Sequence, residues 1–165
     1  GNGIEIYRDR PRAEWRTRDG RLKMDTLPLE YEGILAKAGG EGDLSKLPTG
    51  TKIGHIHLHV AHLDESVTFY RDVIGFDLML KYGPSAAFLS AGGYHHHLGI
   101  NTWAGVGAPP PVDGSTGLHF FKVELSDKDD VDALSIRLQQ AGILHELSQT
   151  GLLVRDPSQN KILFV

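Results

Sequence analysis

The chain has 165 residues, of which 40% are hydrophobic and 23% charged, a composition that fits one packed domain with or without an appendage. A formal net charge of −4 without a long basic run argues against a nucleic-acid partner, and no apolar run reaches the ~20 residues of a membrane span. The absence of cysteine excludes disulfides and thiolate ligands, so histidine and carboxylate remain as metal ligands. We identify no signal peptide and expect a cytoplasmic protein.

The two ends of the chain match in residue type. Gly1–Tyr7 parallels Gln159–Val165 position by position, so that Glu5 falls on Leu163. An internal repeat whose first copy keeps only its last strand explains this match. We therefore expect residues 1–8 to be the last strand of a preceding, mostly absent domain, and the chain to be the C-terminal part of a longer protein.

Residues 9–50 are predicted to be a linker. Their first part is rich in charges of both signs, which is typical of a solvated, salt-bridged segment. Leu29–Ala38 has the composition of a short helix, with Gly39 and Gly40 as its stop, and residues 41–49 have the composition of a loop.

Residues 51–165 contain a pattern that occurs twice: one strand, one helix and three strands. In residues 52–103 we predict strands at His55–Val60, Phe76–Leu80, Ala86–Ser90 and His95–Asn101, and a helix with Asp64 or Ser66 as N-cap and Gly75 as its stop. In residues 117–165 we predict strands at Leu118–Leu125, Ile143–Leu147, Leu152–Arg155 and Lys161–Val165, and a helix over Asp129–Ala141. Gly54 and Gly117 are predicted to occupy the same place in the two units. The expected fold is α+β, with paired βαβββ modules forming cupped sheets around a cleft.

Histidines concentrate in the first module. In the predicted strand His55–Val60, alternation puts His55, His57 and His59 on one face and apolar residues on the other. A second cluster, His95–His97, begins the last strand of the same module, and seven of the nine histidines lie between positions 55 and 97. Imidazole suits Zn, Fe(II), Mn and Ni, so the pattern predicts part of a metal site. The alternative, that these are hydrogen-bonded core or surface histidines, stays open.

Alternation does not decide which histidine of the second cluster faces the cleft. His96 shares its side of the predicted strand with Leu98 and Ile100, whereas His95 and His97 lie on the other side. A simple amphipathic strand therefore favours His95 or His97.

Several stretches of the chain resemble the vicinal oxygen chelate superfamily, which contains glyoxalase I, extradiol dioxygenases and bleomycin-resistance proteins. These stretches are Gly54-His55, the run from Asp64 through Tyr70 to Phe76, and Gly92–Trp103. The resemblance covers Lys52 to Val165 and is closest to two-domain catechol 2,3-dioxygenase-like proteins. Asn2–Pro11 resembles the end of the first domain of those proteins.

The resemblance implies metal ligands. Extradiol enzymes use the histidine of the first Gly-His pair, a histidine on the fourth strand and a glutamate on the last strand, which correspond here to His55, His96 and Leu163. Because Leu163 cannot bind a metal, we hypothesise that Glu5, its counterpart in the repeat, completes the site with His55 and His96. The acid–base histidine and tyrosine of the family have no counterpart, and we consider His57 as a proton carrier or a substrate contact.

The expected function is that of a metal-dependent extradiol-type dioxygenase, an oxidoreductase acting on a catechol-like aromatic with dioxygen. Fe(II) or Mn(II) fits this chemistry best, with Zn or Ni as alternatives. A glyoxalase-type isomerase or lyase and a metal-free, resistance-type binding protein are the two rival expectations. We also expect a homo-oligomer, such as a dimer, and a missing N-terminal domain as a partner.

Overall fold

A computed structural model describes residues 3–16, 18–24, 27–37, 47, 49–112 and 114–165. The chain divides into two compact units, one formed by Gly1–Asp9 with His55–Val165 and the other by Arg10–Gly54. The first unit contains both predicted modules. Within the described ranges, no helix is long and apolar enough to cross a membrane.

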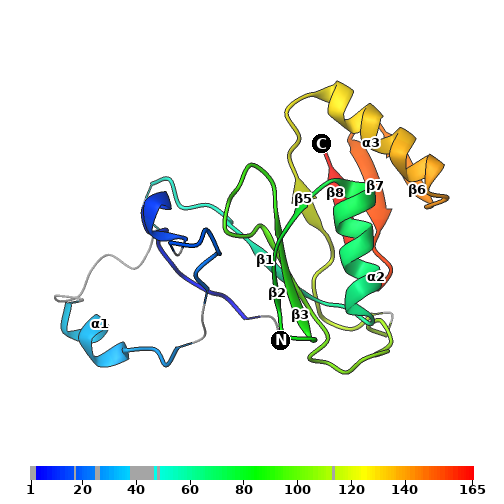
Figure 1. Ribbon diagram of the computed structural model, residues 1–165. Coiled ribbons are helices and arrows are strands. Elements are labelled where there is room, and N and C mark those ends of the chain that lie inside the picture. Colours follow the sequence, from blue (N-terminus) through cyan, green and yellow to red (C-terminus); the bar gives the residue numbers. More distant parts are fainter. Residues whose placement is uncertain (1–2, 17, 25–26, 38–46, 48, 113) are drawn as a thin grey trace. The chain divides into compact units, whose positions relative to one another are not determined.

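The first module forms a four-stranded sheet with the order β1-β4-β3-β2 (Figure 1). Its strands are β1 (Ile56–His59), β2 (Asp77–Tyr82), β3 (Ala86–Ser90) and β4 (Leu98–Asn101). β1 runs parallel to β4, and the other pairs are antiparallel. Helix α2 (Leu63–Thr68) and a π-helical segment (Phe69–Ile74) connect β1 to β2, and Gly75 ends them with a φ of 101°. Only glycine adopts this left-handed backbone at no steric cost, so the predicted stop is confirmed.

The second module repeats this arrangement with the order β5-β8-β7-β6. Its elements are β5 (Phe121–Val123), α3 (Lys128–Gln140), β6 (His145–Ser148), β7 (Gly151–Arg155) and β8 (Lys161–Phe164). β5 runs parallel to β8, as β1 does to β4. Asp127 caps α3 by accepting a hydrogen bond from the amide of Asp130 at 3.0 Å. The predicted α+β fold of two βαβββ modules is therefore confirmed.

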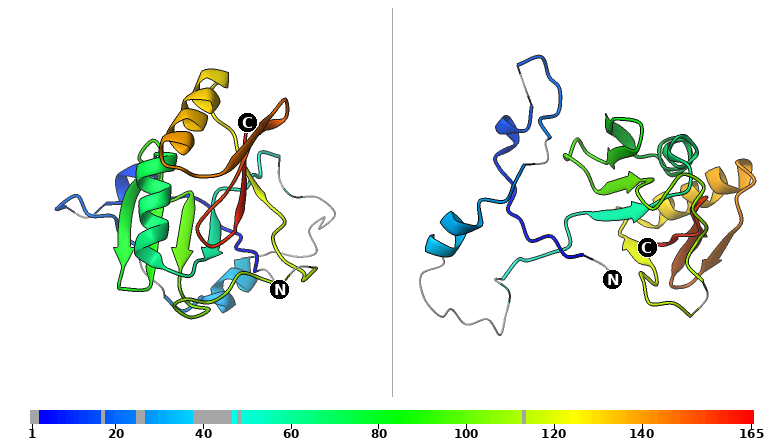
Figure 2. Two further views of the ribbon diagram at one scale, coloured as in Figure 1. Left: turned by 90° about the vertical axis from the view of Figure 1, so that its right-hand side faces the viewer. Right: turned by 90° about the horizontal axis from the view of Figure 1, so that it is seen from below.

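One apolar core joins the two modules. Leu58 and Leu98 from the first sheet, Ile162 from the second, and Tyr70 and Leu138 from the helical segments all belong to one buried cluster. Both helical segments thus cover the apolar face of the sheets (Figure 2). In β1, Leu58 is buried while His57 and His59 on either side of it are exposed, which is the alternation that the sequence predicts. The histidines consequently lie on the face opposite the core.

A turn of the second module holds the end of β1. The Asp156 carboxylate is buried and accepts hydrogen bonds from the hydroxyl of Tyr70 (2.9 Å), the amide of Ser158 (2.9 Å) and the amide and side chain of Asn160 (2.8 and 2.9 Å). Asn160 also donates to the carbonyl of His59 at 3.2 Å, and the hydroxyl of Ser158 accepts from the amide of Ala61 at 2.8 Å. The tripeptide Asp156–Ser158 does form a turn, and its side chains fix the modules to one another.

In the second unit, Arg10–Gly54, few of the described residues form regular structure. It has a 3-10 helix at Arg12–Glu14, the short helix α1 (Tyr31–Lys37) and an isolated bridge between Arg16 and Leu22. The predicted helix over Leu29–Ala38 is thus found two residues late at its start, while its predicted glycine stop lies outside the described residues. The predicted loop at 41–49 falls mostly on residues that are likewise not described.

Two local predictions are wrong, and a third stays a prediction. Gly3–Arg8 pair with no strand of the described residues, but the strand predicted there belongs to a preceding, mostly absent domain that would supply its neighbour. α2 begins at Leu63 after His62, so neither Asp64 nor Ser66 is its N-cap. β4 begins at Leu98, which leaves His95–His97 in the preceding loop, where strand alternation does not apply.

The predicted correspondence between positions in the first strands of the two modules is wrong by two residues. β1 pairs His57 with Gly99, and β5 pairs Lys122 with Leu163 in the corresponding place. Gly54 therefore corresponds to His119 and not to Gly117. Because the error is an even number of residues, the prediction of which side chains face away from the core is unaffected.

Candidate metal centre

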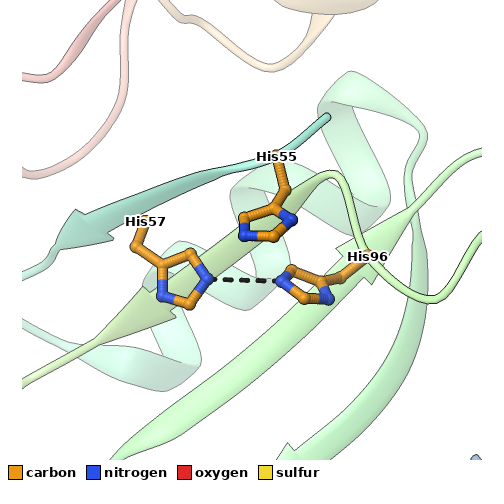
Figure 3. A group of neighbouring side chains, drawn as sticks. All are labelled: His55, His57 and His96. Atoms are coloured by element: carbon orange, nitrogen blue, oxygen red, sulfur yellow. Dashed lines mark hydrogen bonds between the residues drawn. The ribbon is translucent and has the colours of Figure 1, made fainter. Parts of the chain in front are cut away.

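Three imidazole rings meet beside the open end of the first sheet. His57 lies in β1, His55 is the residue before that strand, and His96 comes from the loop that leads into β4 (Figure 3). One ligand atom of each lies within 4.8 Å of the other two, and Nε2 of His57 is 3.2 Å from Nε2 of His96. The ring centroid of His55 is 4.4 Å from that of His96 and 5.2 Å from that of His57. Residues 39 positions apart thus form one histidine cluster.

Backbone pairing explains why His96 and not its neighbours enters the cluster. The amide of Ile56 donates to the carbonyl of His97 at 2.9 Å, and the amide of His97 donates to the carbonyl of Leu89 at 2.9 Å. The ring of His97 meanwhile accepts from the amide of Ala91 through Nδ1 at 3.2 Å. His97 is held at the edge of the sheet, and His96 projects toward His55 and His57.

Gly99 makes room for His57. The two residues are partners across β1 and β4, and a Cβ atom at Gly99 would lie 3.1 Å from the His57 ring. Such a contact is tighter than normal packing, so the ring rests directly on the glycine backbone. Phe88 is the partner of Gly99 on the neighbouring strand β3, and its ring centroid lies 6.1 Å from that of His57 and 4.9 Å from that of His96.

The N-terminal segment supplies the remaining polar groups. Glu5 Oε2 lies 3.1 Å from His55 Nε2, and Asp9 Oδ1 lies 2.9 Å from His95 Nε2. The ring of Tyr7 stacks on that of His55, with the centroids 4.7 Å apart. Residues 3–9 therefore approach the histidine cluster although they form no strand.

The histidine cluster is electrostatically unfavourable for protonated imidazole. Burial, followed by the nearby His55, His95 and other histidines, lowers the pKa of His96 to about 3. Burial and the neighbouring His55 also lower the pKa of His57. Both rings are therefore neutral at physiological pH, which is the form that binds metal ions.

The environment of Asp9, by contrast, favours the charged form of its side chain. Burial favours its neutral form, but hydrogen bonds from His95 and from the hydroxyl of Tyr94 outweigh burial and lower the pKa of Asp9. Asp9 is consequently a carboxylate that accepts hydrogen bonds from the loop beside the histidine cluster.

The residues present fit a divalent metal ion. Nδ1 of His55 is buried and has no hydrogen-bond partner, an arrangement that costs free energy unless another group satisfies the atom. Two nitrogens bound at about 2.0–2.1 Å to one ion, at angles between octahedral and tetrahedral, lie about 2.9–3.4 Å apart. The 3.2 Å between Nε2 of His57 and Nε2 of His96 falls in this range, and so does the 3.1 Å between Glu5 Oε2 and His55 Nε2. Imidazole and carboxylate donors suit Fe(II), Mn(II), Zn(II) and Ni(II) alike.

The structure brings together all four residues that sequence reasoning selected, Glu5, His55, His57 and His96, and Glu5 lies against His55. Among the described residues, the other four histidines of this part of the chain, His59, His62, His95 and His97, lie outside the histidine cluster.

Sequence reasoning missed Asp9 and Tyr94, and it considered His95 only as a metal ligand and not as a partner of Asp9. These residues are hydrogen-bonded to one another beside His96. The stretches that contain them had been noted as motifs, but no periodicity links a carboxylate at position 9 to a loop at 95. A contact over 86 positions between irregular segments leaves no local signal.

Comparison with known proteins gives concordant results. Residues 52–164 match the family described as the Glyoxalase/Bleomycin resistance protein/Dioxygenase superfamily. The chain is 48% identical over 159 residues to a Bacillus subtilis (strain 168) protein named catechol-2,3-dioxygenase. The match covers 95% of this chain and 55% of the relative. The chain thus spans about half the length of the curated relative it matches.

Solved structures share the fold. A lactoylglutathione lyase from Agrobacterium tumefaciens matches with a TM-score of 0.52 and 26% identity, covering 72% of this chain and 94% of that one. A glyoxylase/bleomycin resistance protein/dioxygenase domain from Frankia sp. EAN1pec matches with a TM-score of 0.54 and 21% identity, covering 69% and 95%. At 21% identity, the likeness to the Frankia domain concerns the fold alone.

Proposed function

Since this chain belongs to the Glyoxalase/Bleomycin resistance protein/Dioxygenase superfamily, we propose that it carries the metal centre of an extradiol-type dioxygenase acting on a catechol-like aromatic. The observation that carries the proposal is the histidine cluster, in which His55, His57 and His96 converge beside Glu5. The likeness to a relative named catechol-2,3-dioxygenase supports the choice of dioxygenase chemistry within a superfamily of several activities.

The proposed ligands are His55, His96 and Glu5. Two histidines and one carboxylate with open positions form the usual ligand set of non-haem Fe(II) oxygenases. Glu5 supplies the carboxylate that Leu163 cannot, and its Oε2 is already 3.1 Å from a ring nitrogen of His55. Fe(II) or Mn(II) in this set would act as a Lewis acid that lowers the pKa of a bound phenol and brings the reactants together.

His57 is proposed as the proton carrier. Its Nε2 lies 3.2 Å from Nε2 of His96, and the residue is partly exposed on the face away from the core, so a substrate at the metal can reach it. Its lowered pKa keeps the imidazole neutral at physiological pH, as a general base requires. Phe88, which contacts the rings of both His57 and His96, offers an apolar surface to the aromatic ring of the substrate.

The ligand set has one specific rival. The three imidazoles lie close enough to hold an ion without Glu5, which would then accept a hydrogen bond from His55 and orient its ring. Metal content separates the two arrangements. If Glu5 is a ligand, Glu5→Ala lowers metal content as much as His96→Ala does, whereas His57→Gln retains metal and loses turnover. Unchanged metal content in Glu5→Ala would leave the three histidines as the ligand set.

The function is tested by oxygen consumption. The Fe(II)- or Mn(II)-loaded chain is mixed with catechol, and uptake of dioxygen is followed together with formation of the ring-opened product. Uptake that disappears in His96→Ala and persists in the control variant Glu14→Ala, in the other unit, supports the proposal. Metal loading without oxygen uptake would contradict it.

A lyase or isomerase of the glyoxalase type is the second candidate. Its support is the 26% identity to a structure titled lactoylglutathione lyase. Such chemistry stabilises an enediolate and uses a redox-inactive ion, so it predicts activity with Zn or Ni and no oxygen uptake. Tight binding of an aromatic ligand by the metal-free chain, without turnover under any loading, would favour the resistance-type binding protein.

A further inference from the structure

We propose that Asp9, acting through His95, fixes the proton on Nδ1 of His96 and so leaves Nε2 of His96 as the lone pair that faces the histidine cluster. Asp9 and His95 are thus positioning residues for a ligand that they help to orient. The proposal deepens the proposed function, because the use of that lone pair rests on the metal site. The proton arrangement itself, however, is present in the metal-free chain.

The first step is the contact between Asp9 and His95. Asp9 Oδ1 lies 2.9 Å from Nε2 of His95, and the other carboxylate oxygen accepts from the hydroxyl of Tyr94 at 2.9 Å. An ionised carboxylate only accepts hydrogen bonds. Nε2 of His95 must therefore carry the proton that it donates to Asp9.

The second step follows from the chemistry of neutral imidazole, in which one ring nitrogen donates and the other accepts. With its proton on Nε2, His95 offers Nδ1 as an acceptor. Nδ1 of His95 lies 2.8 Å from Nδ1 of His96, a distance that requires a proton on one of the two nitrogens. The donor is then Nδ1 of His96.

The third step leads to the histidine cluster. With its proton on Nδ1, His96 has an unprotonated Nε2, and this atom is the one that lies 3.2 Å from Nε2 of His57. In the metal-free chain His57 donates its Nε2 proton to that lone pair. The carboxylate of Asp9 thus determines a proton position two residues further along the chain of contacts, in the way that an outer carboxylate fixes the tautomer of a metal-binding histidine.

A similar contact exists at His55, where Glu5 meets Nε2. Glu5 touches a ring of the histidine cluster directly, whereas Asp9 reaches His96 only through His95. Both carboxylates come from residues 3–9. This short segment therefore serves the first module twice, once at each of two histidines.

The test is nuclear magnetic resonance of the ring nitrogens in the metal-free chain at pH 8. Long-range proton–nitrogen correlations identify which nitrogen of each histidine carries the proton, and His95→Gln and His96→Gln assign the signals. We expect the proton on Nε2 of His95 and on Nδ1 of His96. A proton on Nε2 of His96 would overturn the proposal.

Asp9→Asn tests the origin of this order. An amide presents either an acceptor or a donor to His95, so we expect the signals of His96 to shift to a mixture of the two tautomers. Asp77→Asn, at an exposed position in β2, is the matched control and should leave the tautomers unchanged. His95→Phe keeps a ring and ends the chain of contacts, and should also give the mixture. An unchanged His96 tautomer in Asp9→Asn or His95→Phe would overturn the proposal.

Metal affinity provides the second readout. Loss of an outer partner of a metal-binding histidine typically lowers metal affinity by about 10–100-fold, which we expect for Asp9→Asn with Mn(II) and not for Asp77→Asn. If the natural chain has the expected tautomers but binds no metal, the proposed function fails and the tautomer assignment stands. If the natural chain binds Mn(II) and Asp9→Asn binds it equally well, the positioning role fails and the proposed function stands.

Discussion

The two modules share a topology and a register but differ in the side chains that face away from the core. At corresponding places, the first module has His57, Gly99 and Phe88, and the second has Lys122, Leu163 and Leu153. The residues that face the core are apolar in both. One backbone plan therefore occurs twice, and among the described residues the histidine cluster belongs to the first copy alone.

This difference separates what the fold requires from what the site requires. The core side of each sheet needs only apolar residues of suitable volume, and both modules meet this need. The open side is free to vary, so the first module accommodates histidines there and the second does not. In the proposed ligand set the carboxylate comes instead from Glu5, on a segment that belongs to neither sheet and that contacts His55.

The largest expected effect is a loss of stability from substitutions in the apolar core that both modules share. Leu98 in β4 and Ile162 in β8 are matched, with 2% and 1% of their surface exposed. Because both side chains belong to one core, Leu98→Ala and Ile162→Ala should each lower the free energy of unfolding by about 2–5 kcal/mol. Chemical denaturation followed by circular dichroism measures the loss. A loss confined to one variant would mean that the modules are stabilised separately.

The next effect concerns the contact between the modules. Asp156→Ala leaves the buried hydroxyl of Tyr70 without its acceptor and removes the acceptor that holds the backbone amide and side chain of Asn160, so we expect a loss of about 3 kcal/mol in unfolding free energy. Tyr70→Phe removes a single donor and should cost about 1 kcal/mol. The same denaturation curves check both. Equal losses would contradict the role of Asp156 as the common acceptor.

A transfer between modules tests the part that differs. Gly99→Leu puts into β4 the residue that β8 carries at Leu163, where the same register accepts it. In β4 the new side chain meets the His57 ring, so we expect at least a tenfold loss of turnover by the metal-loaded chain, with little change in fold. The reciprocal Leu163→Ala should leave metal affinity unchanged. Full turnover in Gly99→Leu would show that the position of His57 is unimportant.

The smallest effect is the response to acid. The folded chain keeps His96 neutral down to a pKa of about 3, whereas the unfolded chain takes up the proton near an ordinary pKa of about 6.5. The contribution of this group is present above pH 6.5 and is lost as the pH falls toward 3. We expect His96→Gln to lose less stability between pH 7 and pH 4.5 than the natural chain, and the control His119→Gln to lose as much. Equal losses in the natural chain and His96→Gln would contradict the pKa shift.

Much of the fold follows from the sequence because its signals are local. The alternation around Leu58 and the glycine at position 75 predict a strand face and a helix end, and both are observed. The strand predicted to begin at His95 begins only at Leu98. Whether a residue joins a strand depends on partners across the sheet, and these are not encoded nearby.

The candidate site was predictable only in part. The histidines stand close together in the sequence, and the family resemblance selected His96 where alternation favoured its neighbours. The two carboxylates show the limit. Glu5 was found through the repeat, and Asp9 was not found because its contact with His95 joins two irregular segments.

The most direct test of the account is metal binding by equilibrium dialysis against Mn(II), followed by elemental analysis of the natural chain and of His96→Ala. If the histidine cluster binds the metal, we expect close to one ion per chain for the natural sequence and almost none for His96→Ala, with the circular dichroism spectrum unchanged. Absence of bound metal in the natural chain, or equal binding by His96→Ala, would contradict it.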